Sequence, residues 1–318
     1  MDDKNFQNNG GNRPRRPRLT AAPKDDNRKE NNNLRSSNGK RHLNNTKSHP
    51  ARINRLKGAE EIIQNKIRRR KNKQAPPEPK HDGTTRLNKY ISNAGICSRR
   101  DADKLIEAGA VSVNGEVVTT LGFKVKEGDV VSYGGEVLRS EPKRYFLLNK
   151  PKGYITTLDD PQERNTVMQL MQGCCRERIY PVGRLDKNTT GLLLFTNDGE
   201  MAKKLTHPSS NVYKIYQVET DRPVSRTDMQ QMLDGIELED GPIAVDDVQY
   251  NGDGRDRRIV GVALHSGKNR IVRRIFEHFG YEVHKLDRCV FAGLTKKDLP
   301  RGRYRELTQQ EVNYLMMV

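Results

Sequence analysis

The stretch that decides the fold is Gly183-Arg-Leu-Asp-Lys-Asn-Thr-Thr-Gly-Leu-Leu-Leu-Phe-Thr-Asn-Asp-Gly199. Its apolar half, Gly191 to Thr196, predicts a buried strand, and Asn197-Asp-Gly199 predicts a turn and a helix start. The segment Ile179 to Val182 on the other side is also strand-like. Asp186 is therefore expected in a polar loop between two strands, and loops that strands hold in place often carry catalytic residues. From spacing alone, Asp186 is more commonly interpreted as a residue that closes a turn than as a catalytic residue.

The surrounding sequence predicts an α+β domain that extends from about residue 143 to 318. Candidate strands are Tyr145–Leu148, Gly191–Thr196, Tyr213–Glu219, Val245–Tyr250, Arg258–His265, Tyr281–His284 and Leu286–Phe291. Candidate helices begin near Thr166, Gly199, Ser225, Asn269 and Thr308. Strands and helices do not alternate regularly, which favours a mostly antiparallel sheet over a doubly wound one.

Residues 86–139 predict a second, smaller domain. Apolar residues at i, i+3 and i+4 from Leu87 indicate a short helix, and Ser98 is placed to cap another. Alternating Val111 and Val113 lead into Asn114-Gly115, and Val117 and Val118 follow it, which predicts a hairpin with a type I′ turn. The segment therefore reads as two short helices followed by a short hairpin sheet.

The first 85 residues have a composition typical of disordered chains, with many Asn, Arg, Lys and Pro residues and few apolar ones. They hold 22 Lys and Arg against 9 Asp and Glu, most of the chain's net charge of +17. Such a segment either tethers the protein to RNA electrostatically or is a solubilising extension. The excess of positive charge indicates a nucleic-acid partner, with an anionic membrane as the weaker alternative.

Composition also argues against several other kinds of protein. No apolar run approaches the roughly 18 residues that cross a bilayer, and the N-terminus is polar, so we expect a cytoplasmic protein without a signal peptide. The cysteines lack metal-ligand spacing and are expected to be reduced packing residues, without zinc; they are Cys97, Cys174, Cys175 and Cys289. Nothing indicates a coiled coil, and we expect a monomer.

The smaller domain resembles the S4 RNA-binding domain. The matching segments are Arg86-Leu-Asn-Lys-Tyr-Ile, Cys97-Ser-Arg-Arg-Asp-Ala, Ile106-Glu-Ala-Gly and Val113-Asn-Gly-Glu. The resemblance implies that Ser98, Arg99, Arg100 and Lys104 lie near RNA phosphates. From the residues alone, the two arginines are equally compatible with a solvated helix start.

The larger domain resembles the pseudouridine synthases that modify small- and large-subunit ribosomal RNA. Beside Gly183–Gly199, the matching segments are Leu148-Asn-Lys-Pro-Lys-Gly153, Lys214-Ile-Tyr-Gln-Val218 and Gly267-Lys-Asn-Arg-Ile-Val-Arg-Arg274. With the S4 segment, the likeness covers residues 86 to 311. The resemblance implies that the chain isomerises a uridine in ribosomal RNA. The amino-acid sequence of Asn269–Arg274 favours large-subunit RNA as the substrate.

The resemblance assigns Asp186 as the carboxylate that attacks the target nucleotide. The reaction moves a glycosidic bond from N1 to C5 of uracil without a redox step or group donor, so no cofactor is demanded. The matching Tyr216 either stacks on the uracil or assists proton transfer. Arg184 helps to extract the nucleotide or binds phosphate, and Lys214 shares the strand face of Tyr216 as a candidate RNA contact.

Helical periodicity and the resemblance both indicate Arg273. At 100° per residue, Val272, Ile275, Phe276 and Phe279 form a buried stripe, and Arg273 lies at its edge. A buried aspartate needs a nearby cation to stay charged, which predicts an ion pair between Arg273 and Asp186. Ile271 replaces a residue that is often polar in this family, which leaves substrate contacts at that turn undefined.

Two other kinds of protein remain as alternatives. An S4 domain with a basic tail is sufficient for a non-catalytic RNA-binding or ribosome-assembly protein. A metal-dependent nuclease would need carboxylates clustered near Asp186, and the sequence does not place them there.

Overall fold

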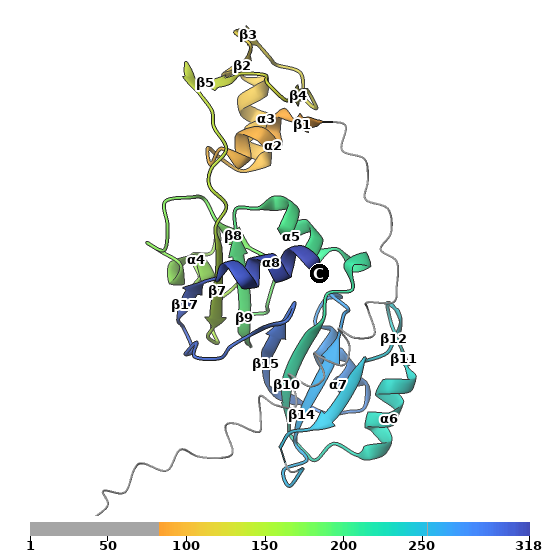
Figure 1. The fold of residues 1–318 in the computed structure, drawn as a ribbon. Helices are drawn as coiled ribbons and strands as arrows, with labels where there is room; N and C mark the ends of the chain where they lie inside the picture. Colours follow the sequence, from red (N-terminus) through yellow and green to blue (C-terminus); the bar gives the residue numbers. More distant parts are fainter. Residues whose placement is uncertain (1–82, 253) are drawn as a thin grey trace, which may run out of the picture. The chain divides into compact units, whose positions relative to one another are not determined.

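The computed structural model describes residues 83–252 and 254–318 (Figure 1). Except for residues 83–85, the expected N-terminal tail lies outside these ranges, and the two domains are described one by one. Within the described ranges, every helix is too short or too polar to cross a membrane.

The N-terminal domain contains the two predicted helices, α2 (Leu87–Asn93) and α3 (Arg99–Glu107). Ser98 caps α3, because its hydroxyl accepts a hydrogen bond from the backbone N–H of Asp101 at 3.2 Å. Residues such as Ile91, Ala102 and Ile106 form the buried contact surface of the two helices. The periodicity of the sequence was therefore sufficient to predict this helix pair.

Short strands complete the N-terminal domain. Their order is β3 (Glu116–Val117), β2 (Val111–Val113), β5 (Val131–Tyr133) and β6 (Glu136–Val137), with a separate pair of β1 (Thr84–Arg86) and β4 (Lys124–Lys126). The turn between β2 and β3 has positive φ angles of 53° at Asn114 and 85° at Gly115, as a type I′ turn requires. Strand β1 begins two residues before the expected domain start at residue 86.

The described residues of the C-terminal domain form a nine-stranded sheet. Its main path is β13 (Asp247–Tyr250), β14 (Ile259–Leu264), β10 (Lys214–Thr220), β15 (Val283–Phe291), β9 (Thr189–Thr196), β7 (Tyr145–Lys150) and β17 (Tyr304–Glu306). In addition, β16 (Leu294–Thr295) pairs with β15, and β8 (Tyr180–Pro181) pairs with β9. The pairing of β9 with β15 is parallel, whereas the neighbouring pairs are antiparallel.

Strand β9 is buried on both faces. On one face, Leu192 and Leu194 pack in a cluster with side chains of α5 (Gly199–Thr206) and α8 (Gln309–Met317). On the other face, Leu193 and Phe195 pack with α4 (Val167–Leu170). Because both faces of β9 are buried, its sequence is a continuous apolar run.

A third cluster covers β10, β13, β14 and β15. It is completed by α6 (Arg226–Asp234), α7 (Ile271–His278) and the hairpin of β11 (Ile236–Leu238) and β12 (Gly241–Ile243). Figure 1 shows α6 and α7 beside strands β10 and β14. The stripe predicted for α7 is confirmed at Val272, Ile275 and Phe276, which are all buried.

One expectation about the strands was wrong. The sequence suggested separate strands at 281–284 and 286–291, but β15 is continuous from Val283 to Phe291. Lys285 interrupts the apolar pattern, yet the backbone pairing with β10 continues through it, and its Nζ lies 3.0 Å from a carboxylate oxygen of Glu219, its partner on β10. A cross-strand ion pair of this kind stabilises a polar position in an exposed sheet row.

Candidate active site

The loop that carries Asp186 joins β8 to β9 and is tied to the domain by its backbone. The hydroxyl of Thr156 donates to the Leu185 carbonyl at 2.8 Å and accepts from the Leu185 N–H at 3.2 Å. The N–H of Thr189 donates to the Asp186 carbonyl at 3.0 Å, and the N–H of Gly153 donates to the Lys187 carbonyl at 2.9 Å. These bonds fix the main chain on both sides of Asp186, whose side chain is partly exposed.

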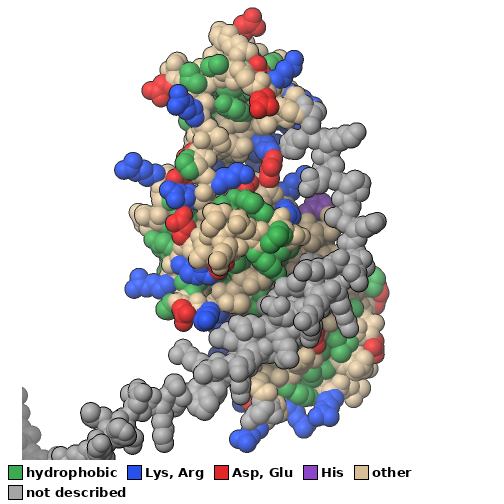
Figure 2. All heavy atoms as spheres, in the orientation of Figure 1, with side chains coloured by type: hydrophobic (Ala, Val, Ile, Leu, Met, Phe, Trp, Pro, Cys, Tyr) green, Lys and Arg blue, Asp and Glu red, His purple; other side chains and the backbone are tan. Residues whose placement is uncertain are grey.

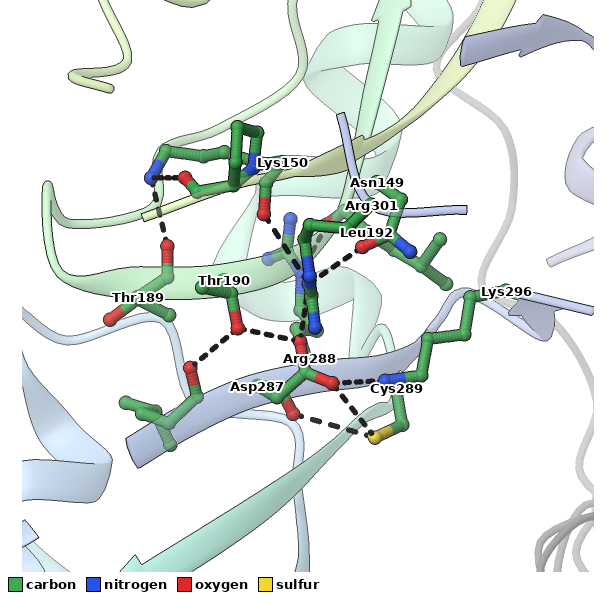
Figure 3. Close-up of polar contacts among 12 residues, drawn as sticks. Asn149, Lys150, Thr189, Thr190, Leu192, Asp287, Arg288, Cys289, Lys296 and Arg301 are labelled. Atoms are coloured by element: carbon green, nitrogen blue, oxygen red, sulfur yellow. Dashed lines mark hydrogen bonds and ion pairs between the residues drawn. The ribbon is translucent and has the colours of Figure 1, made fainter. Parts of the chain in front are cut away.

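A buried lysine lies against the same loop. Lys150, the last residue of β7, is 0% exposed, and its Nζ donates to the carbonyls of Thr189 at 2.8 Å and Asp186 at 3.0 Å. Figure 3 shows the Lys150 side chain turned toward the Thr189 carbonyl. Sequence reasoning missed this residue because lysine is almost always exposed.

The loop continues into a very close strand contact. Gly191 on β9 pairs with Arg288 on β15, and a Cβ at position 191 would lie 2.3 Å from the Arg288 carbonyl oxygen. Gly191 also has a φ of 109°, which residues with a side chain rarely adopt. Glycine is therefore required here, and it allows β9 and β15 to meet directly beyond the Asp186 loop.

Tyr216 lies across this strand contact from the loop. It pairs with Arg288 in the register of β10 and β15, so it belongs to the same cross-strand row as Gly191. Its ring packs against the cluster that contains Leu185 and also against the cluster that contains Ile271. Tyr216 thus packs both against the cluster that includes a residue of the Asp186 loop and against the cluster that includes residues of helix α7.

Arg273 on α7 is 8% exposed, so periodicity placed it correctly on the inner side of the helix. Its Nη1 donates to the Val283 carbonyl at 2.8 Å, while its buried Nε has no hydrogen-bond partner among the described residues. Burial and the charge of Arg270 lower the pKa of Arg273, and the negative charges of Asp186 and Glu277 raise it. Asp186 therefore interacts electrostatically with Arg273.

The expected direct ion pair between Arg273 and Asp186 is not formed. The salt bridges found in the described ranges do not include this pair. Instead, Arg273 Nη1 is hydrogen-bonded to the Val283 carbonyl at the start of β15, which anchors the guanidinium on that strand and away from the carboxylate. Arg273 and Asp186 therefore interact through their charges without a direct ion pair.

A polar network, drawn in Figure 3, joins the start of β9 to β15 and to the segment after β16. The Thr190 hydroxyl and Arg301 Nη1 each donate to Asp287 Oδ1 at 2.8 Å, and Lys296 forms an ion pair with Oδ2 of the same carboxylate. Arg301 Nη1 also donates to Asn149 Oδ1 at 2.6 Å. Although burial alone would raise the pKa of Asp287, Arg301 and Lys296 lower it to about 2.

The remaining predicted RNA contacts differ in the exposure and hydrogen bonding of their side chains. Arg184 is exposed beside Asp186. Lys214 is partly buried, and its Nζ donates to the carbonyls of Val212 at 3.0 Å and His265 at 2.8 Å. Burial and the charge of Arg288 lower the pKa of Lys214 to about 8, although Asp246 raises it. This geometry favours a structural role for Lys214 over contact with RNA.

In the N-terminal domain, three of the predicted residues, Ser98, Arg99 and Arg100, lie at the start of α3, whereas Lys104 lies in its last turn. Ser98 is occupied as the cap, and Lys104 forms an exposed ion pair with Asp101 at 3.1 Å. Arg99 donates weakly to Asn88 at 3.4 Å, and both Arg99 and Arg100 are exposed. The two arginines are therefore the members of this group best placed to meet a phosphate.

The described surface carries both signs of charge. Figure 2 shows Lys and Arg side chains interspersed with Asp and Glu on the visible face. Groups of three or more His, Cys, Asp or Glu side chains able to hold a metal ion are not found among the residues described.

Comparison with known proteins gives consistent matches. A family model described as RNA pseudouridylate synthase matches residues 144–278, and the S4 domain model matches residues 85–131. An uncharacterised RNA pseudouridine synthase of Aquifex aeolicus is 41% identical over 235 residues, 72% of this chain and 93% of that protein. The ribosomal large subunit pseudouridine synthase B of Bacillus subtilis is 41% identical over 232 residues, 72% of this chain and 95% of that protein.

A solved structure agrees with these matches. The crystal structure of a pseudouridylate synthase aligns with a TM-score of 0.53 at 30% identity, over 72% of this chain and 99% of the other. The two family models match in the order in which the two domains follow each other here. The chain therefore belongs to the RNA pseudouridine synthase family and carries an S4 domain ahead of its catalytic domain.

Proposed function

We propose that this chain converts a uridine of large-subunit ribosomal RNA to pseudouridine, with Asp186 as the catalytic carboxylate. The observation that carries the proposal is that Asp186 lies on a loop tied down by Lys150 and Thr156, while Tyr216 packs against the cluster that contains the neighbouring Leu185. The target is supported by the name of the Bacillus subtilis relative, a ribosomal large subunit enzyme.

The chemistry needs few groups. The N1–C1′ bond of uridine breaks, the uracil turns, and a C5–C1′ bond forms; the C5 hydrogen leaves as a proton and N1 gains one. A carboxylate acting on the ribose or the base starts this sequence, which is covalent or acid–base catalysis by a single side chain. We assign that step to Asp186, because its backbone is fixed while its side chain remains accessible.

Tyr216 and Arg273 complete the proposed site. The Tyr216 ring is held between two packed clusters, which gives a detached uracil a fixed surface to stack on. The hydroxyl of Tyr216 is also a candidate to receive the C5 proton. Arg273 supplies a buried positive charge that interacts with Asp186 without a direct contact.

RNA recognition is assigned to exposed arginines. Arg184 adjoins Asp186 and is placed to fill the gap left when the target nucleotide leaves its stack. Arg99 and Arg100 on α3, with Ser98 and Lys104 beside them, are the proposed phosphate contacts of the S4 domain. Two other functions compete with the proposal, namely modification of small-subunit RNA and RNA binding without catalysis.

Mapping pseudouridines in both ribosomal RNAs of a strain lacking this gene tests the proposal. We expect one uridine of the large-subunit RNA to lose its modification and to regain it with the wild-type gene but not with Asp186→Asn. Loss at a small-subunit position would reassign the substrate. Unchanged maps in both RNAs would favour a role in binding alone.

A further inference from the structure

Two adjacent cysteines lie in the segment between α4 and β8 (Figure 1). The chain has four cysteines, and only Cys174 and Cys175 are neighbours in sequence. Both carry free thiols and are partly exposed, and their sulfur atoms are 3.7 Å apart. An oxidant can therefore reach this pair of thiols and join them without a long movement of the chain.

Hydrogen bonds hold the two thiols in a fixed segment. The Cys174 thiol donates to the Cys175 sulfur, and the Cys175 thiol donates to the Glu177 carbonyl at 3.4 Å. The Glu177 carboxylate is in turn bound by Arg144 Nε at 3.0 Å. The segment that carries the thiols is thus anchored to the residue before β7.

We propose that Cys174 and Cys175 form a modification site, at which a small-molecule disulfide oxidises the two thiols to a disulfide bond between them, and that this bond slows the reaction assigned to Asp186. The first part is independent of the proposed function. The second part rests on it, because it describes a change at Asp186.

The oxidation needs no reactant besides the small-molecule disulfide. Cys174 loses its proton, and its thiolate attacks one sulfur of the oxidant, which forms a mixed disulfide and releases one thiolate. Cys175 then loses its proton and attacks the Cys174 sulfur, which releases the second half of the oxidant. The two released thiolates take up the two protons, so the products are one protein disulfide and two small-molecule thiols.

The surroundings of the two thiols indicate which one reacts first. Burial, the Cys174 thiol and Glu177 raise the pKa of Cys175. A thiol with a raised pKa is rarely ionised, and the thiolate is the nucleophile in disulfide exchange. Cys174 is therefore the thiol that attacks the oxidant, and Cys175 reacts second, when the mixed disulfide already lies beside it.

A disulfide between adjacent residues is expected to be readily reduced again. Neighbouring Cα atoms are about 3.8 Å apart across a trans peptide bond, which is less than the roughly 4.4 Å that unstrained disulfides span at the least. Strain of this kind makes a disulfide easier to reduce. The modification should therefore be reversible and should form only when oxidant is in excess.

The cysteine pair also packs against the hydrophobic cluster that contains Leu185, the residue before Asp186, and Tyr216 packs against the same cluster. Disulfide formation shortens the distance between the sulfur atoms from 3.7 Å to about 2.05 Å and removes the thiol hydrogen that Cys175 donates to Glu177. Because protein interiors are closely packed, neighbouring side chains must adjust. Through Leu185, this adjustment reaches the catalytic loop.

Mass spectrometry of the intact protein and of its peptides tests the site, with oxidised glutathione as the oxidant. We expect wild-type protein and the control Cys97→Ser to lose two hydrogen atoms, with the new bond inside the peptide that contains Cys174 and Cys175. Cys175→Ser should instead retain one glutathione on Cys174, and Cys174→Ser should react about 10-fold more slowly. An unchanged wild-type mass, or a bond that joins two chains or involves Cys97 or Cys289, would overturn the proposal.

Tritium release from ribosomal RNA labelled at C5 of uridine tests the effect on Asp186. Each protein is assayed oxidised and again after reduction with dithiothreitol, under single-turnover conditions with saturating enzyme. We expect oxidation to slow release by wild type and Cys97→Ser about 10-fold, because a small displacement of a catalytic group is costly, and reduction to restore it. The double variant Cys174→Ser/Cys175→Ser should release tritium at the same rate in both assays. Equal release by oxidised and reduced wild type, once its disulfide is demonstrated, would overturn the effect on Asp186.

The failure of the proposed function would give a different result, namely no release by reduced wild-type protein. Amide hydrogen exchange of residues 183–188 then decides whether the disulfide reaches the loop. We expect exchange there to accelerate on oxidation of wild type and to stay constant in the double variant. Constant exchange in both proteins would contradict the coupling.

Discussion

Tyr216 combines a fixed ring with a hydroxyl that makes no hydrogen bond to the described residues. The ring packs against two hydrophobic clusters, one containing Leu185 and the other containing Ile271, so replacement by Phe leaves its packing in place. We predict that Tyr216→Phe retains the wild-type Kd for RNA and the wild-type unfolding temperature. Tritium release should slow by about 100-fold, as expected when a general acid or base is removed. A release rate within threefold of wild type would instead assign Tyr216 to stacking alone, which Tyr216→Leu would then disrupt.

Residues differ in how well the sequence exposes their roles. Asp186, Tyr216 and Arg273 are site candidates named from motif resemblance and, for Arg273, from helical periodicity, and their roles remain predictions. Lys150 was within a quoted segment but could not be identified, because nothing in a sequence shows that a lysine will be enclosed by carbonyls. The Arg273–Asp186 ion pair was wrongly expected for a related reason: the competing acceptor, the Val283 carbonyl, is a backbone atom that side-chain patterns do not reveal.

At the scale of elements, a hairpin holds helix α7 in place. Asp240, between β11 and β12, binds Arg274 of α7 through two contacts at 2.6 and 2.9 Å, and its carbonyl accepts from Lys268 at 2.9 Å. Arg274 lowers the pKa of Asp240 to about 2. The pair is therefore fully present above the ordinary aspartate pKa and is lost as the pH falls through about 2, so at neutral pH it is intact.

We predict that Asp240→Asn loosens the start of α7 and displaces Arg273, because the clamp on the neighbouring Arg274 is removed. Amide exchange in the first turn of α7 should accelerate and tritium release should slow, with RNA affinity retained. Glu237→Gln, an exposed change in the same hairpin, is the matched control and should alter neither quantity. Equal exchange in both variants would show that the hairpin does not hold the helix.

The elements themselves were largely predictable, with informative exceptions. Helices α2, α3 and α7 were found because the spacing of their apolar residues agrees with their burial, and α3 also has the predicted cap at Ser98. Strand β15 was divided at Lys285, since the cross-strand partner Glu219 lies 66 positions away in sequence. The parallel contact of β9 with β15 was not foreseen, because it depends on how closely Gly191 lets two distant strands approach.

At the scale of the whole molecule, Asp287 connects parts of the C-terminal domain that are far apart in sequence. Its carboxylate binds Thr190, Lys296 and Arg301, and Arg301 in turn binds Asn149. Although burial opposes its ionisation, Arg301 and Lys296 lower its pKa to about 2. Because this pKa lies below the unfolded value, the carboxylate stabilises the fold above about pH 4, and the stabilisation disappears as the pH falls through about 2.

We predict that Asp287→Asn lowers the free energy of unfolding by about 2 kcal/mol at pH 7, which corresponds to the pKa shift of the carboxylate. The difference from wild type should shrink between about pH 4 and pH 2, as the wild-type carboxylate becomes protonated. Urea unfolding at several pH values measures this dependence. A difference that stays constant over the whole range would show that the network does not depend on the charge of Asp287.

The order of the two domains and their fold class could be predicted, because each domain has its own motifs and its own spacing of apolar residues. The S4 segment and the pseudouridine synthase domain match their family models in the expected order. The basic segment before residue 83 lies outside the described residues, so its role as an RNA tether remains a prediction from composition. The described chain is only mildly basic, so the proposed RNA contacts depend on particular residues such as Arg99, Arg100 and Arg184 and not on overall charge.

The most direct test of the account is tritium release by purified protein from ribosomal RNA labelled at C5 of uridine, compared between wild type, Asp186→Asn and Asp298→Asn. The control makes the same chemical change at an exposed residue with a φ of 54°, a conformation that asparagine tolerates. We predict wild-type release by Asp298→Asn, and none by Asp186→Asn despite equal RNA affinity. Undiminished release by Asp186→Asn, or RNA binding without any release by the wild-type protein, would contradict the account.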